Sequence, residues 1–104
     1  MDSYFIKLDA THSHLKMRLA EIRFDLRSTV RQTKEALERR FGSSADTMNL
    51  ELRDTAGNFL AAMTNDQETL AHYGPQEGYT LHVVDSAPST LLAQFEDVSQ
   101  VEKY

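Results

Sequence analysis

Apolar and polar residues alternate with a period of two at the start of the chain. Over residues 4–9, Tyr4, Ile6 and Leu8 fall on one face, whereas Phe5 falls on the other. This alternation and the aromatic and β-branched content are typical of a strand with one buried face. We therefore expect a first strand with Tyr4, Ile6 and Leu8 turned inward and Phe5 turned outward.

The alternation resumes over residues 16–24, where Ala20, Ile22 and Phe24 share one side. The segment 11–14 between the two runs is polar and suits a turn. Two strands with a short polar connection predict a β-hairpin, here with a loop of four to six residues.

A helix is predicted over residues 30–41 because signals mark both of its ends. Thr29 and Gln32 have the spacing of a capping box, in which each side chain bonds the backbone N–H of the other residue. Gly42 follows as a left-handed stop. One buried stripe is expected at spacings of three and four, made of Val30, Thr33, Leu37 and Phe41.

Three further strands are predicted, over residues 48–53, 59–63 and 79–84, from alternation and from β-branched or aromatic content. Turn residues fill 54–58, and 68–73 suits one helical turn. In the last strand Leu81 and Val83 are expected to point one way, and His82 and Val84 the other.

This order of elements predicts an α+β fold in which one main helix covers one face of a mixed sheet. The first and last strands would pair in parallel at the centre, as in a β-grasp. We expect one domain over residues 1–86. The looser pattern over 87–104 indicates a linker or docking tail.

Charge is unevenly distributed along the 104 residues. The net charge is −5, and Lys103 is the only basic residue after Arg53. Such an acidic second half argues against binding to a nucleic-acid backbone. The basic residues of the first half suit either a solvated helix face, which is the simpler interpretation, or a patch that attracts an acidic partner. They cluster at Arg27, Arg31, Lys34, Arg39 and Arg40.

Little in the sequence suggests catalysis. There is no cysteine, which excludes disulfides, thiolate catalysis and zinc–thiolate sites. His12 and His14 could hold a metal weakly, but no third ligand is obvious, so a pair in a turn is the preferred interpretation. We expect a binding module that is not an enzyme and has no cofactor or metal. We also expect a monomer that does not enter membranes.

Two segments carry a resemblance to known families. Thr29-Val30 at the helix start resembles ubiquitin-like domains, as does the run 70–73 followed by the strand 80–84. The string over 95–104, Phe-Glu-Asp-Val-Ser-Gln-Val-Glu-Lys-Tyr, is similar to the segment after the ubiquitin-like domain of the tubulin-folding cofactor B family. Residues 81–85 are also similar to that family.

The resemblance implies a ubiquitin-like β-grasp that belongs to a cytoplasmic, cytoskeleton-associated tubulin chaperone. Members of that family handle α-tubulin and cooperate with cofactor E in the assembly and disassembly of tubulin dimers. They carry a CAP-Gly domain further along, and its glycine-rich signature is absent here. We therefore expect this chain to be the N-terminal part of a longer protein.

The sequence departs from ubiquitin at functional positions. It has no Gly-Gly end for conjugation, because the last strand runs into residues 85–88. The apolar patch of ubiquitin would correspond to His14 or Leu15, Glu51 and Val84, so the charge of Glu51 breaks it. We expect ubiquitin receptors to bind poorly.

Partner contacts are predicted on two surfaces. One is the outward sheet face, and the other is the tail, which would fold back on the domain or dock a partner. The leading hypothesis is a non-catalytic interaction domain of a tubulin chaperone. The alternatives are an adaptor in ubiquitin or proteasome signalling and a small enzyme. The candidate contact residues are Phe5, Glu51, His82, Val84, Phe95 and Tyr104.

Overall fold

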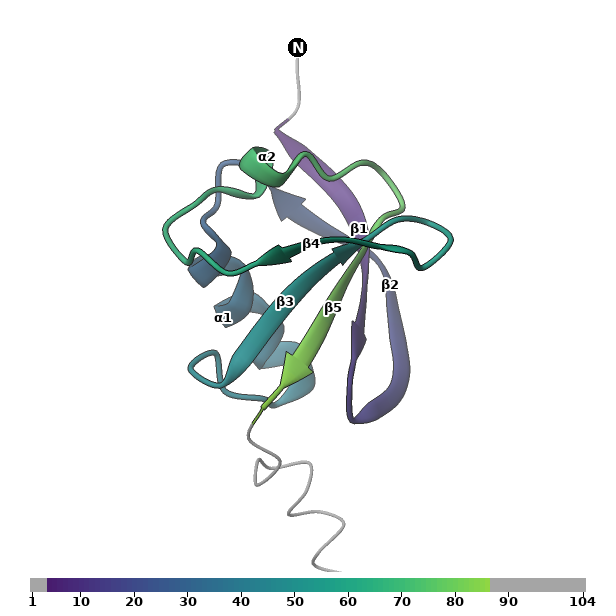
Figure 1. Cartoon of the computed structure of the whole chain (residues 1–104), viewed down its shortest axis with the longest axis vertical. Helices are drawn as coiled ribbons and strands as arrows, with labels where there is room; N and C mark the ends of the chain where they lie inside the picture. The colour runs from purple at the N-terminus through teal and green to yellow at the C-terminus, as the bar shows by residue number, and fades with distance from the viewer. Residues whose placement is uncertain (1–3, 87–104) are drawn as a thin grey trace, which may run out of the picture.

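The computed structural model describes residues 4–86, which form one sheet and two helices (Figure 1). The expected tail, with Phe95 and Tyr104, lies outside these residues. The elements in chain order are β1 (Phe5–His12), β2 (Leu15–Asp25), α1 (Val30–Phe41), β3 (Met48–Arg53), β4 (Phe59–Met63), α2 (Leu70–Tyr73) and β5 (Thr80–Asp85).

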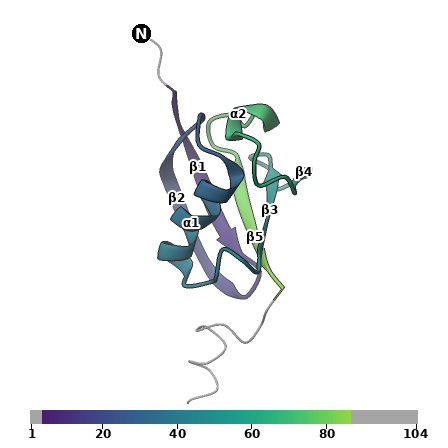
Figure 2. The ribbon, with the colours of Figure 1, turned by 90° about the vertical axis from the view of Figure 1, so that its left-hand side faces the viewer.

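The sheet has the order β2-β1-β5-β3-β4, so the first and last strands of the described region lie side by side at its centre. β1 and β5 are parallel, with Thr11 opposite His82, and the other neighbouring pairs are antiparallel. Helix α1 crosses one face of this sheet (Figure 2). The expected α+β fold, a mixed β-grasp sheet with one main helix, is confirmed.

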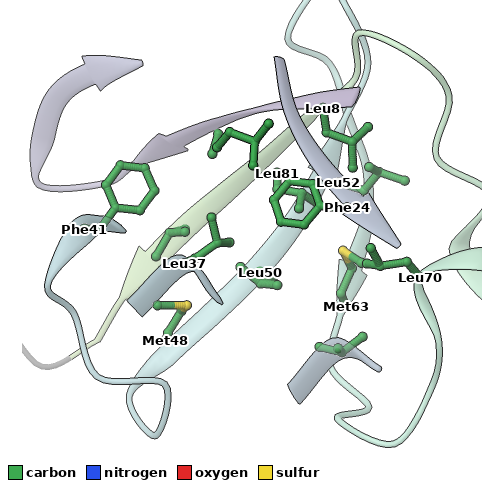
Figure 3. Packing of buried hydrophobic residues seen from close by; sticks show 14 of the residues in the cluster. Leu8, Phe24, Leu37, Phe41, Met48, Leu50, Leu52, Met63, Leu70 and Leu81 are labelled. Atoms are coloured by element: carbon green, nitrogen blue, oxygen red, sulfur yellow. The ribbon is translucent and has the colours of Figure 1, made fainter. Parts of the chain in front are cut away.

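The core lies between α1 and the sheet, where apolar side chains from both layers meet (Figure 3). The predicted helix stripe is confirmed, because all four of its residues are buried. Burying one leucine side chain contributes about 1.5–3 kcal/mol, so this layer contact is the main source of stability. The labelled core residues are Leu8, Phe24, Leu37, Phe41, Met48, Leu50, Leu52, Met63, Leu70 and Leu81.

Both predicted helix ends are confirmed. The Thr29 hydroxyl accepts from the backbone N–H of Gln32 at 3.1 Å, and the Gln32 side chain accepts from the Thr29 N–H at 3.0 Å. Gly42 ends α1 with φ 82°, a left-handed conformation that glycine adopts without a steric penalty. No helix within residues 4–86 is long and apolar enough to cross a membrane.

The loop after β4 docks on the start of α1. Carbonyl oxygens of Asp66 and Glu68 accept from the first helical N–H groups, at Arg31 and Val30, over 3.1 and 2.8 Å. The Asp66 carboxylate also pairs with the Lys34 ammonium at 2.7 Å. The first backbone N–H groups of a helix have no acceptor within the helix. Here a segment more than 30 residues further along the chain supplies their acceptors.

The expectation of a uniformly solvated basic face needs correction at Lys34. This residue is 7% exposed, because its stem packs in the protein and its ammonium reaches Asp66. Arg27 pairs with Asp25, and Arg31 pairs with Glu35 and Asp46. Of the five clustered basic residues, Arg39 and Arg40 fit the prediction best, since both are exposed.

The hairpin also differs from its prediction. β1 continues to His12 and β2 begins at Leu15, so the connection is two residues and not four to six. The polar residues 11 and 12 belong to the strand because the ladder extends to the His12–Leu15 pair.

Two predictions for the hairpin are wrong, the inward position of Tyr4 and the placement of Ala20 on the same side as Ile22 and Phe24. Tyr4 precedes β1 and is 53% exposed, with the Arg27 guanidinium 4.2 Å from its ring centroid. Ala20 is exposed because β2 has a bulge, where the pairing shifts from Leu8–Ile22 to Ala10–Leu19. The extra residue reverses which side chains face the core.

Candidate functional site: the open face of the sheet

The face of the sheet opposite α1 is polar, and we refer to it as the open face. Its outward side chains alternate with the buried residues of β1, β3 and β5. Polar groups on such a face are available to a binding partner. The open face comprises Phe5, Lys7, Asp9, Thr11, Asn49, Glu51, Arg53, Thr80, His82 and Val84.

Three of the predicted contact residues come together on the open face. Glu51 lies directly opposite His82 in the β3–β5 pair, and Val84 lies opposite Asn49 one pair further along. The His82 ring nitrogen Nδ1 is 2.7 Å from the Thr11 hydroxyl of β1. Side chains from three neighbouring strands therefore form one continuous surface.

Phe5 shares this face but lies far from the other candidates. It is six residues before Thr11 on β1, which corresponds to roughly 20 Å along a strand. Phe5 is 44% exposed, and the Arg23 guanidinium is 4.5 Å from its ring centroid. The structure thus separates Phe5 from the cluster around His82.

A pocket of about 450 Å³ opens on the open face beside His82. Its walls come from the hairpin, from the start of β5 and from the loop that joins β3 to β4. The lining residues are Thr11, Arg18, Arg53, Thr55, Ala56, Gly57, Thr80 and His82. Only His82 was among the candidates predicted from sequence.

The alternation of residues 48–53 could have indicated Arg53, which falls on the outward side. Arg18 gave no such signal. The bulge between Leu19 and Ile22 shifts the alternation of β2, so the side of the sheet on which Arg18 lies cannot be read from the pattern of the later residues. Thr55 and Gly57 lie in a segment that the sequence marked only as a turn.

Ion pairs hold both arginines of the pocket in place. Arg18 donates to Asp9 Oδ2 through Nε at 3.0 Å and Nη2 at 2.8 Å, and Nη2 also donates to the Thr80 hydroxyl at 3.0 Å. Arg53 donates through Nη2 to Glu51 Oε1 at 2.7 Å. The Arg53 Nε is buried and has no hydrogen-bond partner among residues 4–86.

His82 is uncharged at neutral pH. Burial lowers its pKa below the ordinary value of 6.5, the nearby Arg53 lowers it further, and Glu51 partly opposes this shift. The neutral ring therefore takes part in the pocket through hydrogen bonding, as its contact with Thr11 illustrates.

The two histidines expected as a turn pair lie in different elements, since only His14 is in the turn. His12 is in β1 and 3% exposed, and its ring packs 5.2 Å from that of Phe41. The His14 N–H donates to His12 Nδ1 at 3.0 Å, so His12 Nε2 carries the proton and donates to the Ser43 hydroxyl at 2.6 Å.

Burial is the main cause that lowers the His12 pKa, and His14 and His82 add to it against the opposing charge of Asp85. His12 is therefore a neutral, buried structural residue. Among the described residues no group of three or more histidine, aspartate or glutamate side chains is placed to bind a metal.

A family model for the ubiquitin-like domain matches residues 5–90. The chain belongs to the ubiquitin-like domain family. This ubiquitin-like domain is similar to tubulin-folding cofactor B of Arabidopsis thaliana, with 37% identity over 101 residues, and to that of Mus musculus, with 34% over 92 residues. These matches cover 95% and 88% of the chain.

Solved structures of cofactor B proteins are also similar to this chain. The tubulin-binding cofactor B structure from Trypanosoma brucei matches with a TM-score of 0.77 and 30% identity over 82% of this chain and 99% of that one. The N-terminal ubiquitin-like domain of cofactor B from Drosophila melanogaster matches with a TM-score of 0.72 and 33% identity over 82% and 88%. The resemblance to this family's N-terminal domain is thereby confirmed.

This ubiquitin-like domain spans a minor part of its curated relatives. The matched residues cover 42% of the Arabidopsis protein and 37% of the mouse protein.

Proposed function

We propose that this ubiquitin-like domain is a non-catalytic protein-interaction module of a tubulin-folding cofactor. It would assist the folding of α-tubulin and the assembly or disassembly of tubulin dimers in the cytoplasm, close to the cytoskeleton. The observation that supports this proposal most strongly is the 37% identity to a tubulin-folding cofactor B over 95% of the chain.

The proposed partners are α-tubulin and tubulin-folding cofactor E, each bound by a monomer of this chain. Two surfaces are proposed for the contact. The first is the open face, where Glu51, His82 and Val84 lie together. The second is the tail, through Phe95 and Tyr104, which lie outside the described residues.

Binding of the full chain to purified tubulin and to purified cofactor E, measured by calorimetry, tests this function. We expect one of the two proteins to bind in a one-to-one complex. Ubiquitin itself serves as the matched control and should give no heat of binding. Absence of binding to both proteins would contradict the proposal.

Substitutions separate the two proposed surfaces. Val84→Ser should weaken binding if the open face makes the contact, and Phe95→Ser with Tyr104→Ser should weaken it if the tail does. Capture of proteasome subunits in place of tubulin would favour the adaptor hypothesis.

A further inference from the structure

The pocket on the open face joins parts of the chain that are far apart in sequence. Thr11 and Arg18 come from the hairpin, Arg53 and Gly57 from the end of β3 and the loop after it, and His82 from β5. Figure 1 shows this loop projecting from the end of β3 on the same side as β1 and β2. The pocket is therefore a product of the tertiary fold.

The polar lining of the pocket is rich in hydrogen-bond donors. Arg18 and Arg53 are permanently charged, and Thr11, Thr55 and Thr80 contribute hydroxyls. No lining residue is acidic. Such a lining is complementary to an anion that accepts several hydrogen bonds.

The two guanidinium groups are positioned before any ligand arrives. Asp9 and Glu51 hold them from outside the pocket lining. Both side chains remain partly exposed, so each guanidinium keeps N–H groups that a ligand can reach. An anionic oxygen in the pocket would accept from these ordered groups at little cost in side-chain ordering.

We propose that this pocket binds the side-chain carboxylates of an acidic peptide segment in a partner protein. The proposal rests on the interaction role given above and specifies the surface and the chemistry of the partner. Arg18 and Arg53 donate to the carboxylate oxygens, and the hydroxyl of the exposed Thr55 supplies a further donor.

The backbone of the pocket favours a carboxylate over a phosphate. Phosphate sites commonly use a run of free backbone N–H groups. Here the N–H groups of Ala56 and Asn58 donate to the Asp54 carboxylate, and that of Gly57 donates to the Asp54 carbonyl. The lining also contains no lysine, the residue that often supplies a point charge in phosphate sites.

An exposed apolar residue next to the pocket favours a peptide over a small free acid. Phe59 is the cross-strand partner of Arg53 and is 56% exposed. Leu60 beside it is 46% exposed. A peptide that carries an apolar side chain next to its acidic residues can contact both the arginines and this part of β4.

A titration of the full, ¹⁵N-labelled chain with hexaglutamate, followed by NMR, tests the proposal. We expect hexaglutamate to shift the amide signals of Thr11, Thr80 and His82, and added salt to weaken the binding. Hexaglutamine is the uncharged matched peptide and should cause no such shifts. Equal shifts with both peptides, or shifts confined to Arg39 and Arg40, would overturn the proposal.

Inorganic phosphate provides a third arm of the same experiment. If phosphate shifts these signals at lower concentrations than hexaglutamate does, the pocket is a phosphate site and the assignment to carboxylates fails. The wild-type comparisons need no variant, so they remain decisive even if a substitution unfolds the domain.

Variants locate the binding site. Arg18→Gln and Arg53→Gln should each weaken hexaglutamate binding about tenfold, because each removes a charged donor. Arg39→Gln with Arg40→Gln is the matched control, since these exposed residues lie on α1 across the other face, and its affinity should not change. Unchanged binding in a folded Arg53→Gln variant would contradict the proposal.

The same variants distinguish this proposal from the proposed function. If tubulin or cofactor E binds the wild type and Arg18→Gln with Arg53→Gln equally well, the interaction role stands and the carboxylate pocket fails. If hexaglutamate binds in the pocket but neither protein binds, the pocket stands and the tubulin-related role fails.

Discussion

The Asp9 carboxylate of β1 accepts a 3.0 Å hydrogen bond from the backbone N–H of Glu21 in β2. Glu21 is the only non-glycine residue with positive φ among the described residues, at 57°, and it lies in the bulge. The other Asp9 oxygen binds Arg18, so one carboxylate links the bulge to the wall of the pocket.

Glu21→Gly should stabilise the protein by about 0.5 kcal/mol. Glycine removes the steric cost of the left-handed conformation, which exceeds its entropic cost in the unfolded chain. Lys16→Gly, at another exposed position of β2, is the matched control and should destabilise the protein. Urea denaturation measures both, and a loss of stability in Glu21→Gly would contradict the expectation.

Asp9→Ala should lower the free energy of unfolding by about 1 kcal/mol, since the Glu21 N–H and the Arg18 guanidinium lose their acceptor. The same variant should broaden the NMR signal of the Arg18 side chain. Asp46→Ala, at an exposed residue in the loop after α1, is the comparison and should have a smaller effect on stability.

Thr29→Ala should lower the free energy of unfolding by about 1 kcal/mol, because the Gln32 N–H loses its capping acceptor. Thr29→Ser retains the hydroxyl and should keep most of the stability. Equal losses in both variants, measured by urea denaturation, would show that the hydroxyl cap contributes little.

Local signals in the sequence were sufficient for the helix and for most strands. Thr29, Gln32 and Gly42 act through neighbouring backbone groups, so their pattern is visible within a few residues. The need to cover one sheet face accounted for the single main helix. The parallel pairing of β1 and β5 was predicted from the analogy to a β-grasp, and the structure confirms it.

The parts that the sequence did not predict depend on distant partners. The bulge that exposes Ala20 is defined by pairing across the hairpin, and local alternation does not reveal it. Lys34 is buried because Asp66 neutralises it from 32 positions away. The pocket was missed for the same reason, since Arg18, Arg53 and Thr80 meet only after folding.

Stability should fall as the pH drops from about 7 to 5. Burial lowers the pKa of His12 and of His82 below 6.5, so the unfolded chain binds protons in this range before the folded protein does. The stabilisation that comes from keeping both histidines neutral is complete above about pH 6.5 and is lost progressively as the pH falls below that value. His12→Gln with His82→Gln should flatten the dependence measured by urea denaturation at each pH. A slope identical to that of the wild type would contradict this explanation.

Ubiquitin receptors that recognise an apolar sheet surface should bind this domain poorly. Glu51 and its partner His82 place polar groups beside Val84, where such receptors need apolar contact. Glu51→Ile should increase binding to a ubiquitin-binding domain in an NMR titration. Tight binding of the wild type through Glu51 and Val84 would refute the prediction.

The central position of β5 has a consequence for biosynthesis. Thr80–Asp85 leaves the ribosome last among the described elements, yet it lies between β1 and β3 and completes both halves of the sheet. The nascent hairpin and α1 therefore remain without their final strand until translation has passed residue 85. A message that ends shortly before residue 80 would yield an unfolded substrate for quality control, and not a smaller working domain.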